Sequence, residues 1–97
     1  MPELVSIRPA NDGVHKYVAT FLMESGRRKN SYFGAKGMDD YTLTHDVEQR
    51  RRYRQRHRKD LQTHDPTRPG FLSYWILWGD STSMRENIAA YRRKFNV

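Results

Sequence analysis

Apolar and polar positions alternate along the first third of the chain. The alternation is clearest in Lys16–Met23, flanked by shorter runs at Leu4–Pro9, with Val5 and Ile7 on one face, and at Lys29–Ala35. In the middle run one face carries Tyr17, Ala19, Phe21 and Met23, and the other carries Val18, Thr20 and Leu22. A period of two predicts three β-strands.

Two turn signals separate these runs. Asn11-Asp12-Gly13 lies between the first and second runs, and Glu24-Ser25-Gly26-Arg27 between the second and third. Short turns of this composition join neighbouring antiparallel strands. Residues 1–37 are therefore predicted to form a three-stranded antiparallel meander.

The spacing of the apolar residues changes from a strand pattern to a helix pattern after the linker that contains Gly34 and Gly37. Tyr41–Leu43 is expected to be a short extended piece, and a helix is expected from Thr44 to about Lys59 or Leu61. Thr44 is a suitable N-cap residue, and acidic side chains follow in the first turn.

Two further helices are predicted after the Pro-containing loop 63–70. Phe71–Trp78 is a short apolar helix, and Ser83 opens the last helix in a capping box. The last helix carries one apolar stripe, formed by Met84, Ile88, Tyr91 and Phe95. Trp75 and Trp78 are expected to be buried in the core rather than to stack on bases.

These elements predict an α+β fold in which the N-terminal three-stranded meander is followed by three helices packed on one face. We expect one domain over 1–97, with the meander at 1–37, an Arg-rich helix at 44–61, and the aromatic and amphipathic helices within 70–97. The Arg-rich helix is expected at the edge of the domain.

Charge indicates the kind of partner. The 97 residues include 18 Lys plus Arg and 11 Asp plus Glu, a net charge of +7. Such an excess favours binding to polyanions. Without cysteine the chain has neither disulfides nor thiolate metal sites. Since no apolar stretch resembles a signal peptide or membrane span, we expect an intracellular protein, in the nucleus or cytoplasm.

Seven of the ten residues in Arg50–Lys59 are basic and none is acidic. The inward stripe of this helix is expected to comprise Asp46, Arg50, Tyr53, His57 and Leu61. The candidate phosphate-binding residues are Arg50, Arg51, Arg52, Arg54, Arg56, Arg58 and Lys59, with Arg27, Arg28 and Lys29 at the second turn as an extension. Phosphate contacts of this kind give affinity without reading sequence.

Two alternatives explain the basic run without nucleic acid. It could be a solvated face paired with nearby acids, namely Asp39, Asp40, Asp46, Glu48, Asp60 and Asp65. It could also be a nuclear localisation signal.

Catalytic and metal-binding patterns are weak. Asp39 and Asp40 with His45 could in principle hold a metal ion, but adjacent carboxylates usually point in different directions. The loop Gly34–Gly37 lacks P-loop spacing. We therefore predict a non-enzyme without metal, cofactor or catalytic residues.

Several motifs resemble one family. They are the stretch Phe33–Thr42, the basic helix with Tyr53, Arg56 and His57, and Gly70–Trp78 followed by a final helix. Over roughly Tyr32 to Phe95 the chain resembles short proteins of unknown function encoded by giant nucleocytoplasmic DNA viruses and by some unicellular algae and protists. The resemblance implies no catalytic residue, and it raises a virion-associated role.

The predicted function is sequence-independent nucleic-acid binding through the Arg-rich helix. The alternative is a minor structural component of a virion or another large assembly, in which the same arginines dock on acidic protein surfaces.

Overall fold

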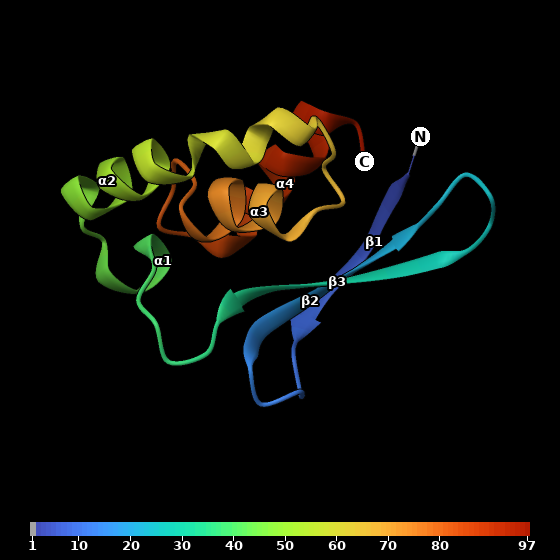
Figure 1. Ribbon diagram of the computed structural model, residues 1–97, viewed down its shortest axis with the longest axis horizontal. Coiled ribbons are helices and arrows are strands. Elements are labelled where there is room, and N and C mark those ends of the chain that lie inside the picture. The colour runs from blue at the N-terminus through green and yellow to red at the C-terminus, as the bar shows by residue number, and fades with distance from the viewer. Residues whose placement is uncertain (1) are drawn as a thin grey trace.

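The chain begins with a three-stranded antiparallel sheet. In the computed structural model, which describes residues 2–97, the strands are β1 (Glu3–Pro9), β2 (His15–Leu22) and β3 (Arg28–Ala35), in the order β1-β2-β3 (Figure 1). Helices follow on one side of the sheet. The α+β class and the N-terminal meander are confirmed.

One detail of β1 differs from the prediction. The register shifts between Leu4 and Ser6, so that Leu4 lies opposite Phe21 and Ile7 opposite Ala19. Leu4 is buried and Ile7 packs against the core, whereas Val5 is exposed. Placing Val5 and Ile7 on one face was therefore wrong, because this irregularity interrupts the alternation of side chains.

The Arg-rich helix begins later than predicted. Tyr41–Thr44 forms a short helix, α1, whose N-cap is Asp40. His45 then adopts a left-handed conformation with φ of 56°, and Asp46 caps α2 (Val47–His57) by accepting a hydrogen bond from the Gln49 amide. The extended piece at 41–43 and the N-cap at Thr44 were wrong, because a carboxylate at both caps divides this segment into two helices.

Beyond α2 the helical path continues in different geometries. A 3₁₀ segment, η1 (Arg58–Thr63), extends α2 past the predicted end. The apolar helix begins as α3 (Pro69–Leu72) and widens into a π-helical turn, η2 (Ser73–Leu77). The last helix is α4 (Met84–Phe95), and Ser83 caps it as predicted, its hydroxyl oxygen accepting from the Glu86 amide at 3.2 Å.

The core lies between the sheet and the apolar helical segments. Tyr17, Ala19 and Phe21 face it from β2, and the predicted stripe of α4 packs against it. α3 and η2 contact β3, while α2 contacts η2 and α1 (Figure 1). Trp78 is buried as expected, but Trp75 is only half-buried. None of the helices in residues 2–97 has the length and apolar character needed to cross a membrane.

Candidate nucleic-acid interface and an adjoining cleft

Tyr53 attaches α2 to the rest of the protein. Its ring stacks on Trp78 with centroids 4.4 Å apart and on His57 with centroids 4.1 Å apart. Burial, reinforced by the nearby Asp60 carboxylate, raises the pKa of the Tyr53 phenol to about 12. With Leu61 packed at the core, these contacts confirm much of the inward stripe expected for this helix.

Arg54 makes several bonds within the protein. Its Nε donates to the Trp78 carbonyl at 2.8 Å and its Nη2 lies 3.0 Å from Asp80 Oδ1. The guanidinium also lies 5.5 Å from the ring centroids of both Tyr74 and Trp75. Two of its donors and its planar face thus hold α2 against the 73–80 segment.

Arg50 has a similar structural role. Its guanidinium lies 4.6 Å from the centroid of the Tyr41 ring. Its Nη1 donates to the carbonyls of Gly79 at 3.3 Å and Asp80 at 3.2 Å. Arg50 and Arg54 were both predicted phosphate ligands, but they have less freedom to contact a partner than the remaining cations.

The other cations of the run project from the helix. Arg51 is exposed and paired with Glu48 at 2.9 Å, a pair of the weak i,i+3 surface type. Arg52, Arg56, Arg58 and Lys59 are exposed, and within residues 2–97 none of them has a hydrogen-bond or ion-pair partner.

The nearby acids are mostly used elsewhere. Of the six considered in the sequence, Glu48 is the one that pairs with an arginine of α2. Four others are engaged with groups other than the α2 arginines: Asp40 with Lys16, Asp46 at the α2 N-cap, Asp60 with His57, and Asp65 with Thr67 and Arg68. Positive charge on the outer side of α2 therefore stays largely uncompensated.

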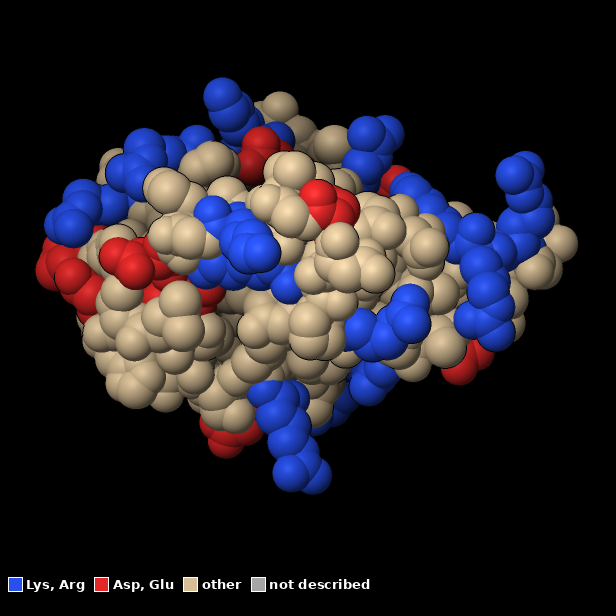
Figure 2. Space-filling model, turned by 90° about the horizontal axis from the view of Figure 1, so that it is seen from below, with Lys and Arg blue, Asp and Glu red and all other residues tan. Residues whose placement is uncertain are grey.

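The second predicted group of cations lies elsewhere. Arg27 and Arg28 are exposed at the β2–β3 turn, and Lys29 donates to Thr67 Oγ1 at 2.8 Å. This turn and α2 occupy opposite ends of the long axis (Figure 1), whose extent is 40 Å. Seen from below, Lys and Arg are spread around the face rather than joined into one patch (Figure 2). The fold does not bring the two groups together.

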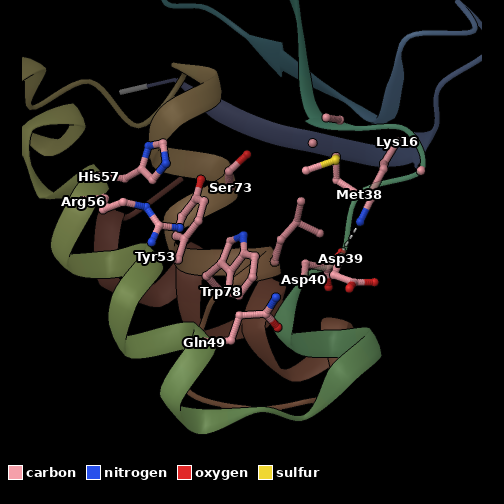
Figure 3. A pocket seen from close by; sticks show the side chains of 14 residues that line it. Lys16, Met38, Asp39, Asp40, Gln49, Tyr53, Arg56, His57, Ser73 and Trp78 are labelled. Carbon is pink, nitrogen blue, oxygen red and sulfur yellow. Dashed lines mark hydrogen bonds and ion pairs between the residues drawn. The ribbon is translucent and has the colours of Figure 1, made fainter.

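A cleft of about 510 Å³ opens beside α2. One wall comes from α2 and η2, and the opposite wall from the loop 34–40 and β2 (Figure 3). The side chains lining it include Gln49, Tyr53, Arg56, His57, Ser73, Leu77 and Trp78 on the first wall, and Lys16, Met38, Asp39 and Asp40 on the second.

A buried ion pair shapes the second wall. Lys16 Nζ lies 2.5 Å from Asp40 Oδ2, and Asp40 is only 2% exposed. The other oxygen of Asp40 accepts hydrogen bonds from the amide and hydroxyl of Thr42, so the carboxylate is fully used. This pair fixes the loop to the sheet and leaves little capacity for a ligand.

Other polar groups in the cleft are available. Arg56 and Asp39 have no partner in the described chain. Gln49 Oε1 accepts a hydrogen bond from the Thr44 hydroxyl, which leaves the Gln49 amide NH₂ free in the described chain. His57 Nδ1 is hydrogen-bonded to the Asp60 carboxylate, which leaves His57 Nε2 free there. The α2 wall thus offers donors and the loop wall offers an acceptor.

Sequence reasoning singled out many of the residues that line this cleft but did not predict that they come together. Gly34–Gly37, Tyr53 and His57 stood out in the sequence motifs, which is a partial signal. Lys16 and Gln49 gave none, because a strand residue and a helix residue meet the loop only in the folded chain. Residues 2–97 contain no cluster of three or more His, Asp or Glu side chains arranged to hold a metal ion.

Comparison with known proteins assigns the chain to a protein family. A protein-family model matches residues 5–57, from β1 to the end of α2, which is more than half of the chain. The match thus includes the N-terminal strands, where the motif resemblance was weakest. No curated protein and no solved structure matched.

Proposed function

We propose that this chain, which belongs to the family of unknown function DUF5754, is a non-catalytic protein that binds nucleic acid without sequence specificity. The contacts would come from the outer side of α2 and the start of η1. The phosphate ligands would be Arg52, Arg56, Arg58 and Lys59, with Arg51 beside them.

The observation that carries this proposal is the lack of charge compensation. Four exposed cations within eight residues have no protein partner in the described chain, while the nearby Asp40, Asp46 and Asp60 cap helices or pair with other groups. Like charges at i,i+4, as at Arg52 and Arg56, repel one another by a few tenths of a kcal/mol. A phosphate backbone relieves this repulsion and releases counterions.

Salt dependence measures the number of phosphates contacted. With four contacts, the slope of log affinity against log salt on duplex DNA should be roughly −3.6. Affinity should then fall about a hundredfold between 50 and 200 mM salt. Fluorescence anisotropy with a labelled duplex of mixed sequence gives both quantities.

A pair of triple variants tests the site itself. Replacing Arg52, Arg56 and Arg58 by Gln removes three free cations of α2 and η1, and should flatten the slope to about −1. Replacing Arg8, Arg27 and Arg28 by Gln lowers the net charge equally, from +7 to +4, on the strands and the β2–β3 turn. This control should keep most of the affinity.

Equal losses in the two triple variants would mean that net charge alone attracts DNA, and the site on α2 would be wrong. Absence of binding at 50 mM salt would reject the nucleic-acid function altogether.

A second function is favoured by exposed apolar side chains. Among residues 2–97, six large hydrophobic side chains are exposed. Three of them lie within ten residues leading into α2, namely Met38, Leu43 and Val47. Such residues suit a protein contact. Together with the resemblance to virus-encoded proteins, they support a minor structural role in a virion or another assembly, with the arginines on acidic protein surfaces.

Replacing Arg52, Arg56 and Arg58 by Lys separates the two functions. A phosphate backbone accepts Lys as a point charge, whereas bidentate carboxylate docking does not. Nucleic-acid binding should stay within about tenfold of the parent. A variant that still binds DNA but is lost from its native particle would favour the assembly role.

A further inference from the structure

We infer that the cleft between the loop 34–40 and α2 receives one unpaired nucleotide of a nucleic-acid strand. This inference rests on the proposed function and extends it, because it makes the protein a reader of single strands rather than of charge alone. The phosphates would follow the outer side of α2 while one base enters the cleft.

The size and floor of the cleft suit a nucleotide. Its volume of about 510 Å³ falls within the range of small-molecule sites. The apolar part of its lining comes from Leu77, Trp78, Tyr53 and Met38. The Tyr53 ring already stacks on Trp78 and on His57, so a planar base would lie against the edges of these side chains and against Met38 rather than on a free aromatic face.

Arg56 connects the cleft with the charged side of the helix. Gln49, Arg52 and Arg56 stand at i, i+3 and i+7, so they share one edge of α2. Gln49 and Arg56 line the cleft, and Arg52 is exposed on the same edge. A strand held along this edge would bring a phosphate to Arg56 and its base to the cleft.

The polar groups are complementary to a nucleoside phosphate. On the α2 wall, Arg56 and the free amide NH₂ of Gln49 donate to phosphate or base acceptors, while the free Nε2 of neutral His57 accepts, because its Nδ1 carries the proton bonded to Asp60. Across the cleft, the free Asp39 carboxylate can accept from a base amino group or a sugar hydroxyl. Figure 3 shows these two sets of side chains on opposite walls. A simple anion such as phosphate would bond only to the donors of the α2 wall and would gain nothing from Asp39.

A comparison of strands with equal numbers of phosphates tests the inference. We would measure binding of a labelled 12-nucleotide single strand and of its abasic counterpart at 150 mM salt. The strand with bases should bind about tenfold more tightly, in line with the contribution of one base contact. Equal affinities for the two strands would overturn the inference while leaving the proposed function intact; no binding of either strand at low salt would reject both.

Two matched variants locate the effect. Arg56→Gln should abolish the preference for the strand with bases. Arg58→Gln, which makes the same change in charge, should lower the affinity for both strands equally and leave the ratio of the two affinities unchanged. A third variant, Ala35→Trp, places a large ring at an exposed position of the cleft and should also abolish the ratio. Circular dichroism melting verifies that each variant is folded. If the ratio of affinities for the two strands is unchanged in both Arg56→Gln and Ala35→Trp, the cleft does not receive the base and the inference is wrong.

Competition distinguishes a nucleotide from a simple anion. Adenosine monophosphate should displace the strand at concentrations where inorganic phosphate at equal ionic strength does not. If phosphate competes as well as the nucleotide, the cleft is an anion site and the inference is wrong.

Discussion

Gly34 lies where the loop of the cleft meets the core. Its φ is +76°, in the region that L-residues avoid, and a Cβ built on it would lie 2.8 Å from Leu77 Cδ1 and 3.2 Å from Lys16 Cβ. Gly37 has a φ of +86° but open space around it. The two glycines therefore share the backbone requirement and differ in packing.

This difference gives a matched prediction for stability. Gly37→Ala should cost about 1 kcal/mol of the free energy of unfolding, from backbone strain alone. Gly34→Ala should cost about 2–4 kcal/mol, because overpacking against Leu77 adds to the same strain. Urea unfolding of the two variants checks the order. Equal costs would show that the Leu77 side chain moves aside without penalty.

At the scale of elements, α2 is held by an arginine fork as much as by apolar burial. It buries no residue fully, and its attachment consists of the Tyr53 stack and the bonds of Arg50 and Arg54 to the 78–80 backbone. A basic helix is thus tied to the protein by some of its own cations while others remain free.

Lysine substitutions test this attachment. Arg54→Lys should cost about 1–2 kcal/mol of unfolding free energy, because all the donors of Lys sit on one nitrogen and cannot reproduce the separate Nε and Nη2 positions that meet Trp78 and Asp80. Arg51→Lys should change it by less than about 0.5 kcal/mol, since its pair with Glu48 is exposed. Chemical denaturation measures both. A stable Arg54→Lys variant would place the anchoring in the Tyr53 stack and the bonds of Arg50.

Across the whole molecule, two phenols connect the helices to their neighbours. Tyr53 stacks under α2, and Tyr91 of α4 donates to the Pro66 carbonyl at 2.5 Å. Burial raises the pKa of Tyr91, as it does that of Tyr53. Both phenols are therefore neutral in the folded chain at pH values where an unfolded chain ionises them.

The raised pKa values of these two phenols make the free energy of unfolding depend on pH. Above the ordinary tyrosine pKa of about 10, the unfolded chain binds fewer protons than the folded chain, so stability falls as pH rises. For Tyr53 the fall should extend from about pH 10 to about 12. Urea midpoints between pH 8 and 11.5 should decline less steeply in Tyr53→Phe and Tyr91→Phe. A decline as steep as in the parent would contradict this account.

The sequence alone determined the elements whose signals are local. Alternation and turn residues specified the meander, the apolar period specified the helices at 69–77 and 84–95, and the run Arg50–Lys59 identified the charged helix. These signals depend on neighbours within a few residues. Where another local signal competed, as at the two carboxylate caps Asp40 and Asp46 or the irregular register after Leu4, the boundaries and faces were assigned wrongly.

The tertiary structure alone decided which charges are free and where a cleft forms. Arg54 is less available to a partner because it donates to the Trp78 carbonyl, 24 residues further along the chain. Lys16 pairs with Asp40 over the same sequence separation. No local period encodes such pairings, because they arise from the packing of the helices on the sheet. The same packing leaves Arg52 and Arg56 without a partner among residues 2–97 and sets Arg56 at the rim of the cleft, opposite Asp39.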